Sequence, residues 1–581
     1  MGEGPQGRSP TPAGSNGEER GPPFVLHWCG RPDRPSRLVG HPCPTPAAAC
    51  NTTATAGYPP HCSRVALLLL PSKPRLLADA RWRAAATTLL VGFVFAAYGA
   101  YPPPDPNEPH YLTKARHFWD PQWCAGDLFL ESRAAHALFY AVWGSPARWV
   151  PLAMLAWIGR ACTWLLLAYG WQRLGGVLGV RGAWAALGAV LFVELQERCQ
   201  LAGEWVIGGL EAKGFAYALV LLALAEFVRG RLGWAAAWAG AATAWHPLVG
   251  GWTGLAMCWS WCSVWPRPRV RRAWPGLVAG GLLALIGVMP ALCMNRGVSP
   301  DVAARAIDIY VLWRLRHHLW PAAFPLEGLL RFGLLLAGWG AMLAAVAWGG
   351  RWHRFWSVCK GAVLIMVVGL ALGLAALAVP GQIISLLRFY WFRTSDVMVP
   401  MAVALGVARL ARRAWGVTKW RVPVGGLVLA AAVSALLAAE QRLTSPSPRA
   451  DKPGKVTDWQ DWRAACLYAA RHTPADARFL TPRLAQTFKW YAGRSETATW
   501  KDTPQDAKAI VEWWGRLRDI YGVDPGWPGW FWCESLAEVS PSRLSELGVR
   551  YGAEYLLVES EPVLDLPCLY RNRSYAIYRL K

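Results

Sequence analysis

The sequence predicts a mainly α-helical membrane protein, in which a bundle of about eleven transmembrane helices is followed by a small α/β domain. Of its 581 residues, 54% are hydrophobic and only 17% are charged, whereas a typical soluble domain carries about 25% charged residues. Apolar stretches of spanning length follow one another between residues 84 and 440. The residues from 450 onward have the composition of a soluble domain.

The apolar stretches define a transmembrane domain over residues 84–440. A helix needs about 20 predominantly apolar residues to cross a bilayer. Many of the 37 Trp residues lie at the ends of these stretches, as in the aromatic belts of membrane proteins. The stretch 232–265 can be divided in more than one way. The predicted spans are 84–101, 149–172, 182–197, 211–228, 232–247, 248–265, 274–294, 328–348, 358–379, 396–411 and 421–440.

The connections between the spans alternate in charge. Every second connection is rich in Arg and Lys, and the connections between them carry most of the Asp and Glu. Because Lys and Arg in short loops mark the cytoplasmic side, the N-terminus is predicted to be cytoplasmic and the C-terminal domain extracytoplasmic. The Arg clusters are then topology signals, and they account for much of the net charge of +23. Nucleic acid is excluded as a partner, because the basic clusters are short and tied to helix ends.

The two ends of the chain differ from the bundle. Residues 1–75 are rich in Pro, Gly, Arg and Ser without a hydrophobic period, which predicts a disordered cytoplasmic tail. Residues 450–581 show helical periodicity over 459–471 and 504–521 and strand patterns at 478–480, 555–559 and 575–580. These patterns predict a small extracytoplasmic α/β domain.

The long first outer loop, residues 102–148, holds a polar motif directly after the first span. From Asp105 it reads Asp-Pro-Asn-Glu-Pro-His-Tyr. A carboxylate in this place can meet a substrate at the membrane surface and take a proton from an acceptor hydroxyl. The alternative is structural: the acids cap loop helices and pair with Lys114 and Arg116.

This loop resembles the first periplasmic or lumenal loop of the GT-C glycosyltransferases, closest to the protein-mannosyl and lipid A aminoarabinosyl transferase branch. That branch has an acidic pair followed by a Tyr, and this chain has Asn107-Glu108 before Tyr111. An aromatic motif at 136–140, an Arg at position 160 and a basic turn at 173–175 agree as well. The match covers about residues 84–230, roughly a quarter of the chain. The first acid of the family pair is Asn107 here.

The resemblance implies a GT-C-like bundle that transfers a sugar from a polyprenyl-phosphate-linked donor to an extracytoplasmic acceptor, with inversion of the anomeric centre. Glu108 would be the general base, with Asp105 in support. The leaving phosphate also needs cations. The residues expected to contact the substrate are His110, Tyr111, Arg160, Lys213, Arg388 and Arg393.

The partners implied are membrane lipids, the lipid-linked donor and the acceptor. No cofactor is assigned, no protein metal ligands are identified, and a divalent cation is left open. The whole chain also resembles uncharacterised bacterial membrane proteins with the same Asn-Glu-Pro-His-Tyr loop. This second resemblance implies the plasma (inner) membrane of a bacterium.

Several of these residues have a structural alternative. Arg160 can anchor the loop instead of binding substrate, and His246, before Pro247, is expected to cap or pack a helix. The default for Glu204 and Glu211 is a solvated loop charge. Glu211 and Lys213 are two positions apart, and on one helix such residues cannot face each other. The arginines of 388–393 can instead snorkel from an interfacial helix.

Two further functions stay open from the sequence. The first is a transporter or flippase for a lipid or small solute, although the spans lack paired acids near their middles and no inverted repeat is evident. The second is a GT-C scaffold without catalysis, for which Asn107 is the main reason.

Overall fold

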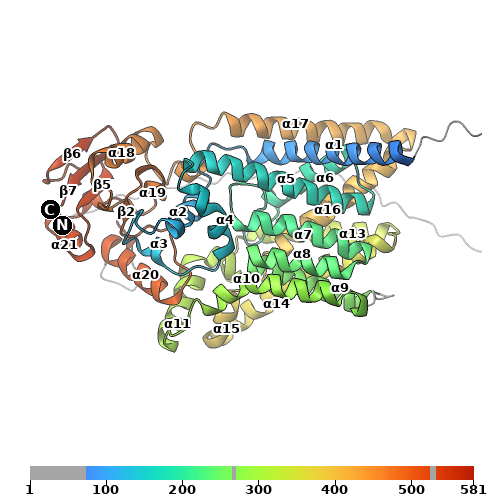
Figure 1. Ribbon diagram of the computed structural model, residues 1–581, viewed down its shortest axis with the longest axis horizontal. Coiled ribbons are helices and arrows are strands. Elements are labelled where there is room, and N and C mark those ends of the chain that lie inside the picture. Colours follow the sequence, from blue (N-terminus) through green and yellow to red (C-terminus); the bar gives the residue numbers. More distant parts are fainter. Residues whose placement is uncertain (1–72, 265–269, 524–530, 581) are drawn as a thin grey trace, which may run out of the picture. The chain divides into compact units, whose positions relative to one another are not determined.

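The computed structural model describes residues 73–264, 270–523 and 531–580. The predicted tail 1–75 therefore lies almost wholly outside the described residues, and its last three positions belong to the first helix. Each of the eleven apolar stretches forms a helix (Figure 1). These helices are α1 (Lys73–Gly99), α5 (Leu152–Leu178), α6 (Ala183–Arg198), α7 (Ala212–Arg229), α8 (Leu232–Trp245), α9 (Pro247–Ser263), α10 (Trp274–Cys293), α13 (Leu326–Ala345), α14 (Gly350–Ala378), α16 (Ser395–Trp415) and α17 (Arg421–Leu443).

Six helices in the described part of the chain are long and apolar enough to cross a membrane, and together they indicate an integral membrane protein. The count of about eleven spans is not confirmed, because α6, α8 and α9 have only 16, 14 and 17 residues. The type of membrane and the direction of the chain through it stay predictions. The six spans are Asp79–Gly99, Leu152–Leu178, Trp274–Cys293, Leu326–Ala345, Gly350–Ala378 and Thr418–Leu443.

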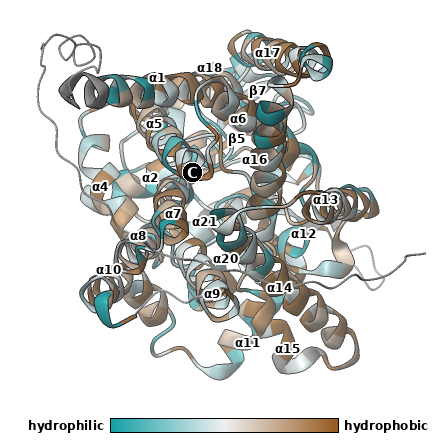
Figure 2. Ribbon diagram, turned by 90° about the vertical axis from the view of Figure 1, so that its right-hand side faces the viewer, coloured by the Kyte–Doolittle hydropathy of each residue, from teal (hydrophilic) through white to brown (hydrophobic). Residues whose placement is uncertain are grey.

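Three of the six spans, in α10, α13 and α17, lie at the edge of the bundle and are little buried. Only 11% of the most apolar part of α10 is buried, and 17% of those of α13 and α17. All three lie at the periphery when the bundle is seen end-on in Figure 2. In contrast, α7 and α16 are largely buried and carry charged residues within their length. Lipid contact therefore accounts for the apolar outer helices, and packing for the more polar inner ones.

Short helices gather at one end of the bundle, which we call the domain end. The first loop contributes α2 (Glu108–Trp119), α3 (Leu128–Glu131) and α4 (Ala137–Ala147). The connection between α10 and α13 contributes α11 (Pro300–Asp308), a π-helical segment η2 (Ile309–Arg314), α12 (Arg316–Leu319) and η3 (Pro321–Ala323). Four further short helices lie in other connections: η1 (Val270–Arg272) between α9 and α10, α15 (Pro380–Leu387) after α14, η4 (Thr418–Trp420) before α17 and η5 (Arg449–Asp451) after α17.

The C-terminal region forms a five-stranded sheet in the order β2-β1-β5-β7-β6. Strand β1 pairs in parallel with β2 and β5, and β7 pairs antiparallel with β5 and β6. The strands are β1 (Arg478–Leu480), β2 (Ser495–Glu496), β5 (Tyr555–Glu559), β6 (Cys568–Arg571) and β7 (Tyr575–Arg579), with a separate ribbon of β3 (Gly522–Val523) and β4 (Phe531–Trp532). The strands predicted at 478–480, 555–559 and 575–580 are confirmed, the last ending one residue earlier.

Helices cover both faces of this sheet. They are α18 (Trp459–His472), α19 (Phe488–Ala492), α20 (Ala507–Tyr521), η6 (Leu536–Glu538) and α21 (Pro541–Tyr551). Side chains alternate along a strand, so Leu557 packs in the cluster with α18 and α19, while Leu556 and Val558 pack with α20 and α21. The two helices predicted over 459–471 and 504–521 are confirmed.

Candidate functional site

A cavity of about 480 Å³ lies at the domain end of the bundle. It is lined by the first loop, the connection between α6 and α7, the junction of α8 and α9, the end of α10, the segment α11–α12 and the segment after α15. The C-terminal domain supplies a further wall. The polar lining residues are Asn107, His110, Tyr111, His136, Glu204, Glu211, Lys213, His246, Asn295, Tyr310, Arg314, His318, Arg388, Tyr390, Arg393, Lys501, Thr503 and Gln505.

The lining is positively charged overall, with five Lys and Arg residues against two Glu residues. A concave site lined mainly by one sign of charge concentrates ligands of the other sign. The cavity also has an apolar edge, where Leu292 at the end of α10 is 71% exposed and Phe389 is 36% exposed. The arrangement suits an anion that carries an apolar group.

Glu211 is the carboxylate in the cavity that lies nearest to the polar motif of the first loop. Asn107 Nδ2 donates a hydrogen bond of 2.9 Å to Glu211 Oε1. Lys213 Nζ lies 3.5 Å from Glu211 Oε2 and 3.9 Å from Glu204 Oε2. All three charged side chains are buried. Asn107, at the position where the resembling family has an acid, thus serves as a donor to a second carboxylate.

Two expectations about these residues were wrong. Glu204 and Glu211 are not solvated loop charges, because both are buried and paired with cations. Glu211 and Lys213 do approach each other. Glu211 precedes the first turn of α7 with an extended backbone, at φ −142° and ψ 154°, so the rule for two residues on one helix does not apply to it.

Arg393 pairs with the other carboxylate of the cavity. Its Nε lies 3.0 Å from Glu204 Oε2, and its Nη1 lies 2.9 Å from His246 Nε2. Its guanidinium also stacks over the ring of Tyr390 at 4.1 Å. His246 caps α9, as predicted, with Nδ1 accepting a weak hydrogen bond from the Val249 amide. His246 therefore has a capping role and also faces the cavity.

Asp396 positions Glu204 through the loop before it. The carboxylate of Asp396, in the first turn of α16, accepts hydrogen bonds of 2.9 Å from the backbone amides of Leu201 and Ala202. A buried carboxylate is stable only when such donors satisfy it. The loop that carries Glu204 is thereby fixed to the helix that follows Arg393.

Glu108 does not line the cavity and is fully buried. Arg160 Nε and Nη2 donate to its two oxygens at 2.7 and 2.5 Å. The amides of Leu210 and Asp105 donate to the same two oxygens at 2.8 and 2.7 Å. Because four donors bind its two oxygens, the carboxylate of Glu108 is already satisfied by hydrogen bonds within the protein.

Asp105 and Arg160 are anchored in the same way and also lie outside the lining. Asp105 Oδ2 accepts the Gly209 amide at 3.0 Å, and Arg449 lies 3.4 Å from its other oxygen. Arg160 Nη1 also donates to the Tyr101 carbonyl oxygen. These contacts hold the backbone at 209–210 against the first loop, which brings Asn107 beside Glu211. The reactive roles expected for Glu108, Asp105 and Arg160 stay predictions, whereas their contacts support positioning roles.

His110 and Tyr111, by contrast, line the cavity. His110 Nδ1 lies 3.3 Å from Asp502 Oδ1 of the C-terminal domain. Burial lowers the pKa of His110 below its ordinary value, and it lowers the pKa of His136 to about 3. Both rings are therefore neutral near pH 7, and the cavity's positive charge comes from its Lys and Arg residues.

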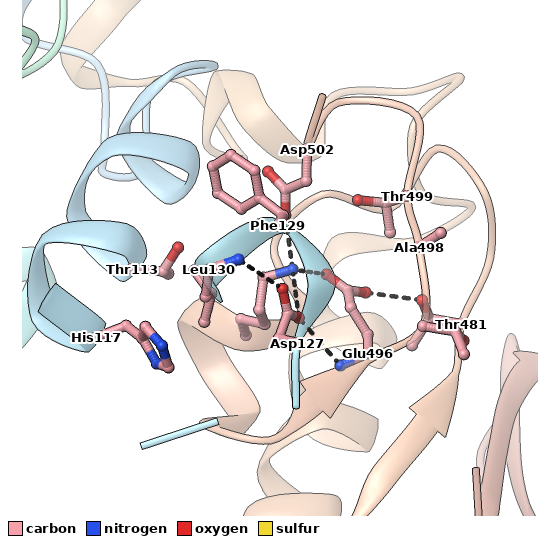
Figure 3. Close-up of polar contacts among 12 residues, drawn as sticks. Thr113, His117, Asp127, Phe129, Leu130, Thr481, Glu496, Ala498, Thr499 and Asp502 are labelled. Atoms are coloured by element: carbon pink, nitrogen blue, oxygen red, sulfur yellow. Dashed lines mark hydrogen bonds and ion pairs between the residues drawn. The ribbon is translucent and has the colours of Figure 1, made fainter. Parts of the chain in front are cut away.

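A buried ion cluster joins the first loop to the C-terminal domain. In Figure 3 the carboxylates of Asp127, Glu496 and Asp502 converge from these two parts of the chain. Lys489 Nζ lies among them at 3.1, 2.6 and 2.6 Å. Burial raises the pKa of Glu496, although Lys489 beside it acts in the opposite direction. Because Asp502 also contacts His110, this cluster connects directly to the cavity lining.

Some, but not all, of the residues expected to bind substrate therefore lie together in the cavity lining. Lys213, Arg388 and Arg393 line the cavity with His110 and Tyr111. Arg388 is exposed and its guanidinium lies 4.9 Å from the Phe389 ring. Within residues 73–264, 270–523 and 531–580, no group of three or more His, Cys, Asp or Glu side chains is placed to hold a metal ion.

Sequence reasoning missed Arg314, His318 and Lys501 as lining residues. A signal existed for the first of them, because Arg314 and Arg316 lie in a connection assigned to the acidic, extracytoplasmic set. Basic residues in an otherwise acidic set of connections are candidates for binding a ligand. Lys501 gave no comparable signal, since a single Lys in a soluble domain is ordinary.

Comparisons with known proteins identify little of the chain. A family profile described as "Domain of unknown function (DUF6798)" matches residues 460–520, which include Lys489 and Lys501. No curated protein matches the chain.

Fourteen chains among the solved structures match. One of them is the oligosaccharyltransferase of Archaeoglobus fulgidus, in a complex with Zn and sulfate. The match has 10% sequence identity and a TM-score of 0.38, and it covers 81% of this chain and 67% of that one. At this TM-score the similarity carries no argument about activity.

Proposed function

We propose that this protein is a membrane glycosyltransferase that uses a polyprenyl-phosphate-linked sugar as donor. The observation that carries the proposal is the cavity itself. It combines an excess of cations, a buried carboxylate at Glu211 and an apolar edge beside lipid-facing helices. The resemblance of the first loop to the GT-C glycosyltransferases supports the same reaction class.

The donor would bind with its phosphate at the cations and its chain at the apolar edge. Arg393 and Lys213 supply charge inside the cavity, and Arg388 supplies it beside Phe389. Arg is suited to this task because its planar fork can donate two parallel hydrogen bonds to a phosphate. The polyprenyl chain would continue along the exposed surface near Leu292.

In the proposed reaction, an acceptor hydroxyl oxygen attacks the anomeric carbon of the donor sugar. The bond between that carbon and the phosphate oxygen breaks, and the electron pair leaves with the phosphate. Glu211 takes the proton of the acceptor hydroxyl, while Asn107 and Lys213 hold the carboxylate in place. The cations nearby stabilise the phosphate as its charge increases. Attack from the face opposite the phosphate inverts the anomeric centre.

Glu108 remains the alternative base, as the resemblance implies. Its four hydrogen-bond donors and complete burial argue against proton transfer to a substrate in the cavity. Glu211 lies in the cavity lining and is bound by fewer donors than Glu108. The two assignments predict different results for the same pair of substitutions.

The test is transfer of radiolabelled sugar from a panel of polyprenyl-phosphate donors to membrane acceptors by the purified full-length chain. Reactions are run with EDTA and with added divalent cations, because the metal requirement is open. We expect transfer by the wild type, loss of about a hundredfold or more in Glu211→Gln, and retained turnover in folded Glu108→Gln. Loss in folded Glu108→Gln alone would return the base to Glu108, and absence of transfer from every donor would refute the proposal.

A further inference from the structure

Arg314 and Lys501 are two cations of the cavity lining that have no carboxylate partner. Among the described residues, neither takes part in an ion pair within 4.0 Å. The other two inner cations differ from them, since Arg393 pairs with Glu204 and Lys213 lies beside Glu204 and Glu211. The excess positive charge of the cavity is thus concentrated at Arg314 and Lys501, with Arg388 at the edge.

Arg314 is held in place by backbone and hydroxyl acceptors. It is only 8% exposed, and its Nε donates to the Trp500 carbonyl oxygen at 3.0 Å and to Thr503 Oγ1 at 2.8 Å. Its guanidinium also stacks on the Trp500 ring at 5.4 Å. These contacts use Nε and leave both Nη groups without a hydrogen-bond partner among the described residues. Neither Nη atom is among the buried atoms that lack a partner in the described part of the chain, so both are open to the cavity and available to a ligand.

In the sequence, Lys501 lies between Trp500 and Thr503, which both accept hydrogen bonds from Arg314. Its ammonium makes no hydrogen bond within the part of the chain that the structure describes, and it lines the cavity. Burial, followed by the charge of Arg314, lowers the pKa of Lys501 to about 8. The other charged groups that act on it are Glu211, Lys213 and Lys455.

We propose that Arg314 and Lys501 form a second anion-binding subsite, which takes a phosphate or carboxylate group of the substrate distinct from the phosphate at Arg393. The two free Nη groups of Arg314 can bind two oxygens of such a group, and Lys501 adds a full charge. As a statement about the substrate, this inference rests on the proposed function. As a statement about binding, it stands on the contacts of these two residues alone.

Two sources of the second anionic group fit this chemistry. One is the second phosphate of a polyprenyl diphosphate donor. The other is an acidic group on the transferred sugar or on the acceptor. Arg393 and Lys213 share their charge with Glu204 and Glu211, whereas Arg314 and Lys501 have no carboxylate beside them among the described residues and keep their charge for a second anion.

The primary test measures binding of inorganic phosphate and pyrophosphate to the full-length protein in detergent by isothermal titration calorimetry. Lys501→Gln is the test variant, because Arg314 contributes to packing and its replacement can disturb the fold. Lys508→Gln is the matched control, since Lys508 is exposed and outside the lining. We expect about tenfold weaker pyrophosphate binding in Lys501→Gln and wild-type binding in Lys508→Gln. Equal affinity in wild type and Lys501→Gln would overturn the inference.

A second measurement tests whether Lys501 itself responds to the bound anion. Because the pKa of Lys501 is about 8, anion binding at pH 8 should draw a proton onto its amine. Titrations in two buffers of different protonation enthalpy measure this uptake. Uptake in the wild type that disappears in Lys501→Gln supports the subsite, and unchanged uptake contradicts it.

The source of the group is decided by comparing ligands. Weaker binding of a polyprenyl diphosphate but not of the monophosphate in Lys501→Gln assigns the subsite to the donor. Weaker binding of glucuronate alone assigns it to an acidic sugar or acceptor. If all three ligands bind the variant as they bind the wild type, the inference fails. Altered binding without any sugar transfer by the wild type would leave the subsite intact and refute the proposed function instead.

Discussion

Glu108 and Glu211 are both buried carboxylates at the domain end, but they differ in what surrounds them. Glu108 shares its oxygens among a bidentate Arg160 and two backbone amides. Glu211 has one side-chain amide and one ammonium, and it faces the cavity. The same residue type therefore serves as an anchor at one position and as a candidate base at the other.

Replacing Glu108 should lower stability more than replacing an exposed glutamate. In Glu108→Gln, Arg160 keeps its buried charge but loses its partner, which typically costs about 3–5 kcal/mol. Thermal unfolding of the detergent-solubilised protein measures the loss, with Glu561→Gln as control because that side chain is 77% exposed. Equal unfolding temperatures for the two variants would contradict the anchoring role.

Asp451 should make stability depend on pH between about 4 and 6. Burial raises its pKa from 3.8 to about 6, although Thr487 and Tyr491 donate hydrogen bonds to it. A folded-state pKa above the unfolded one gives a contribution that is complete below pH 4 and lost as pH rises through 6. With about 1.4 kcal/mol per pKa unit, the decrease is roughly 3 kcal/mol.

Unfolding free energies at pH 4 and pH 7 measure this effect in the wild type and in Asp451→Asn. The asparagine cannot ionise, so its difference between the two pH values should be smaller by that amount. A wild-type difference no larger than that of the variant would show that Asp451 is not perturbed in this way.

At the level of elements, α10 is attached to the bundle mainly by glycines that face α8. A Cβ atom on Gly280 would lie 2.3 Å from the Ala236 carbonyl oxygen, and one on Gly276 would lie 2.3 Å from the Gly233 oxygen. Small residues permit such close approach of two helices in a membrane. Since α10 ends at the apolar edge of the cavity, this contact also positions Leu292.

Gly280→Val should therefore disrupt the α8–α10 contact, whereas Gly281→Val should be tolerated. The Cβ of the first would overlap backbone atoms, and the Cβ of the second meets nothing within 4 Å. Overpacking of this kind costs about 1–3 kcal/mol or more. Unfolding temperature and the yield of monodisperse protein test the pair. Similar behaviour of both variants would show that α10 does not need the close contact.

The sequence predicted individual elements better than it predicted their contacts. The range of α17 and the strand at 555–559 follow from local hydrophobic patterns, and both are present. Lys213, Arg388 and Arg393 were expected from charge at helix ends, and all three line the cavity. No local pattern shows that Arg160 will meet Glu108, 52 positions away, or that Arg314 will hold Trp500, 186 positions away.

For the whole molecule, the ion cluster at Lys489 is a buried polar connection between the first loop and the C-terminal domain. Lys489→Met would leave Asp127, Glu496 and Asp502 buried without their cation. Such a loss typically costs about 3–5 kcal/mol. We expect faster hydrogen exchange in α2 and α3 and faster proteolysis of the first loop.

Lys508→Met is the control for this substitution, because Lys508 is exposed and belongs to the same domain. Its exchange rates should match those of the wild type. Unchanged protection of α2 and α3 in Lys489→Met would mean that apolar packing, rather than the ion cluster, joins the two parts.

The residues of the ion cluster are far apart in the sequence, so the cluster and the cavity can form only in a certain order during translation. The Glu496 amide, which donates to Asp127, follows it by 369 positions. At roughly 5–20 residues per second, the ribosome needs on the order of 20–70 s to add that length. During this interval the first loop has neither Lys489 nor the wall that carries Lys501. A nascent chain therefore cannot complete its cavity, or bind a ligand there, until the segment that carries Lys489 and Lys501 has been synthesised.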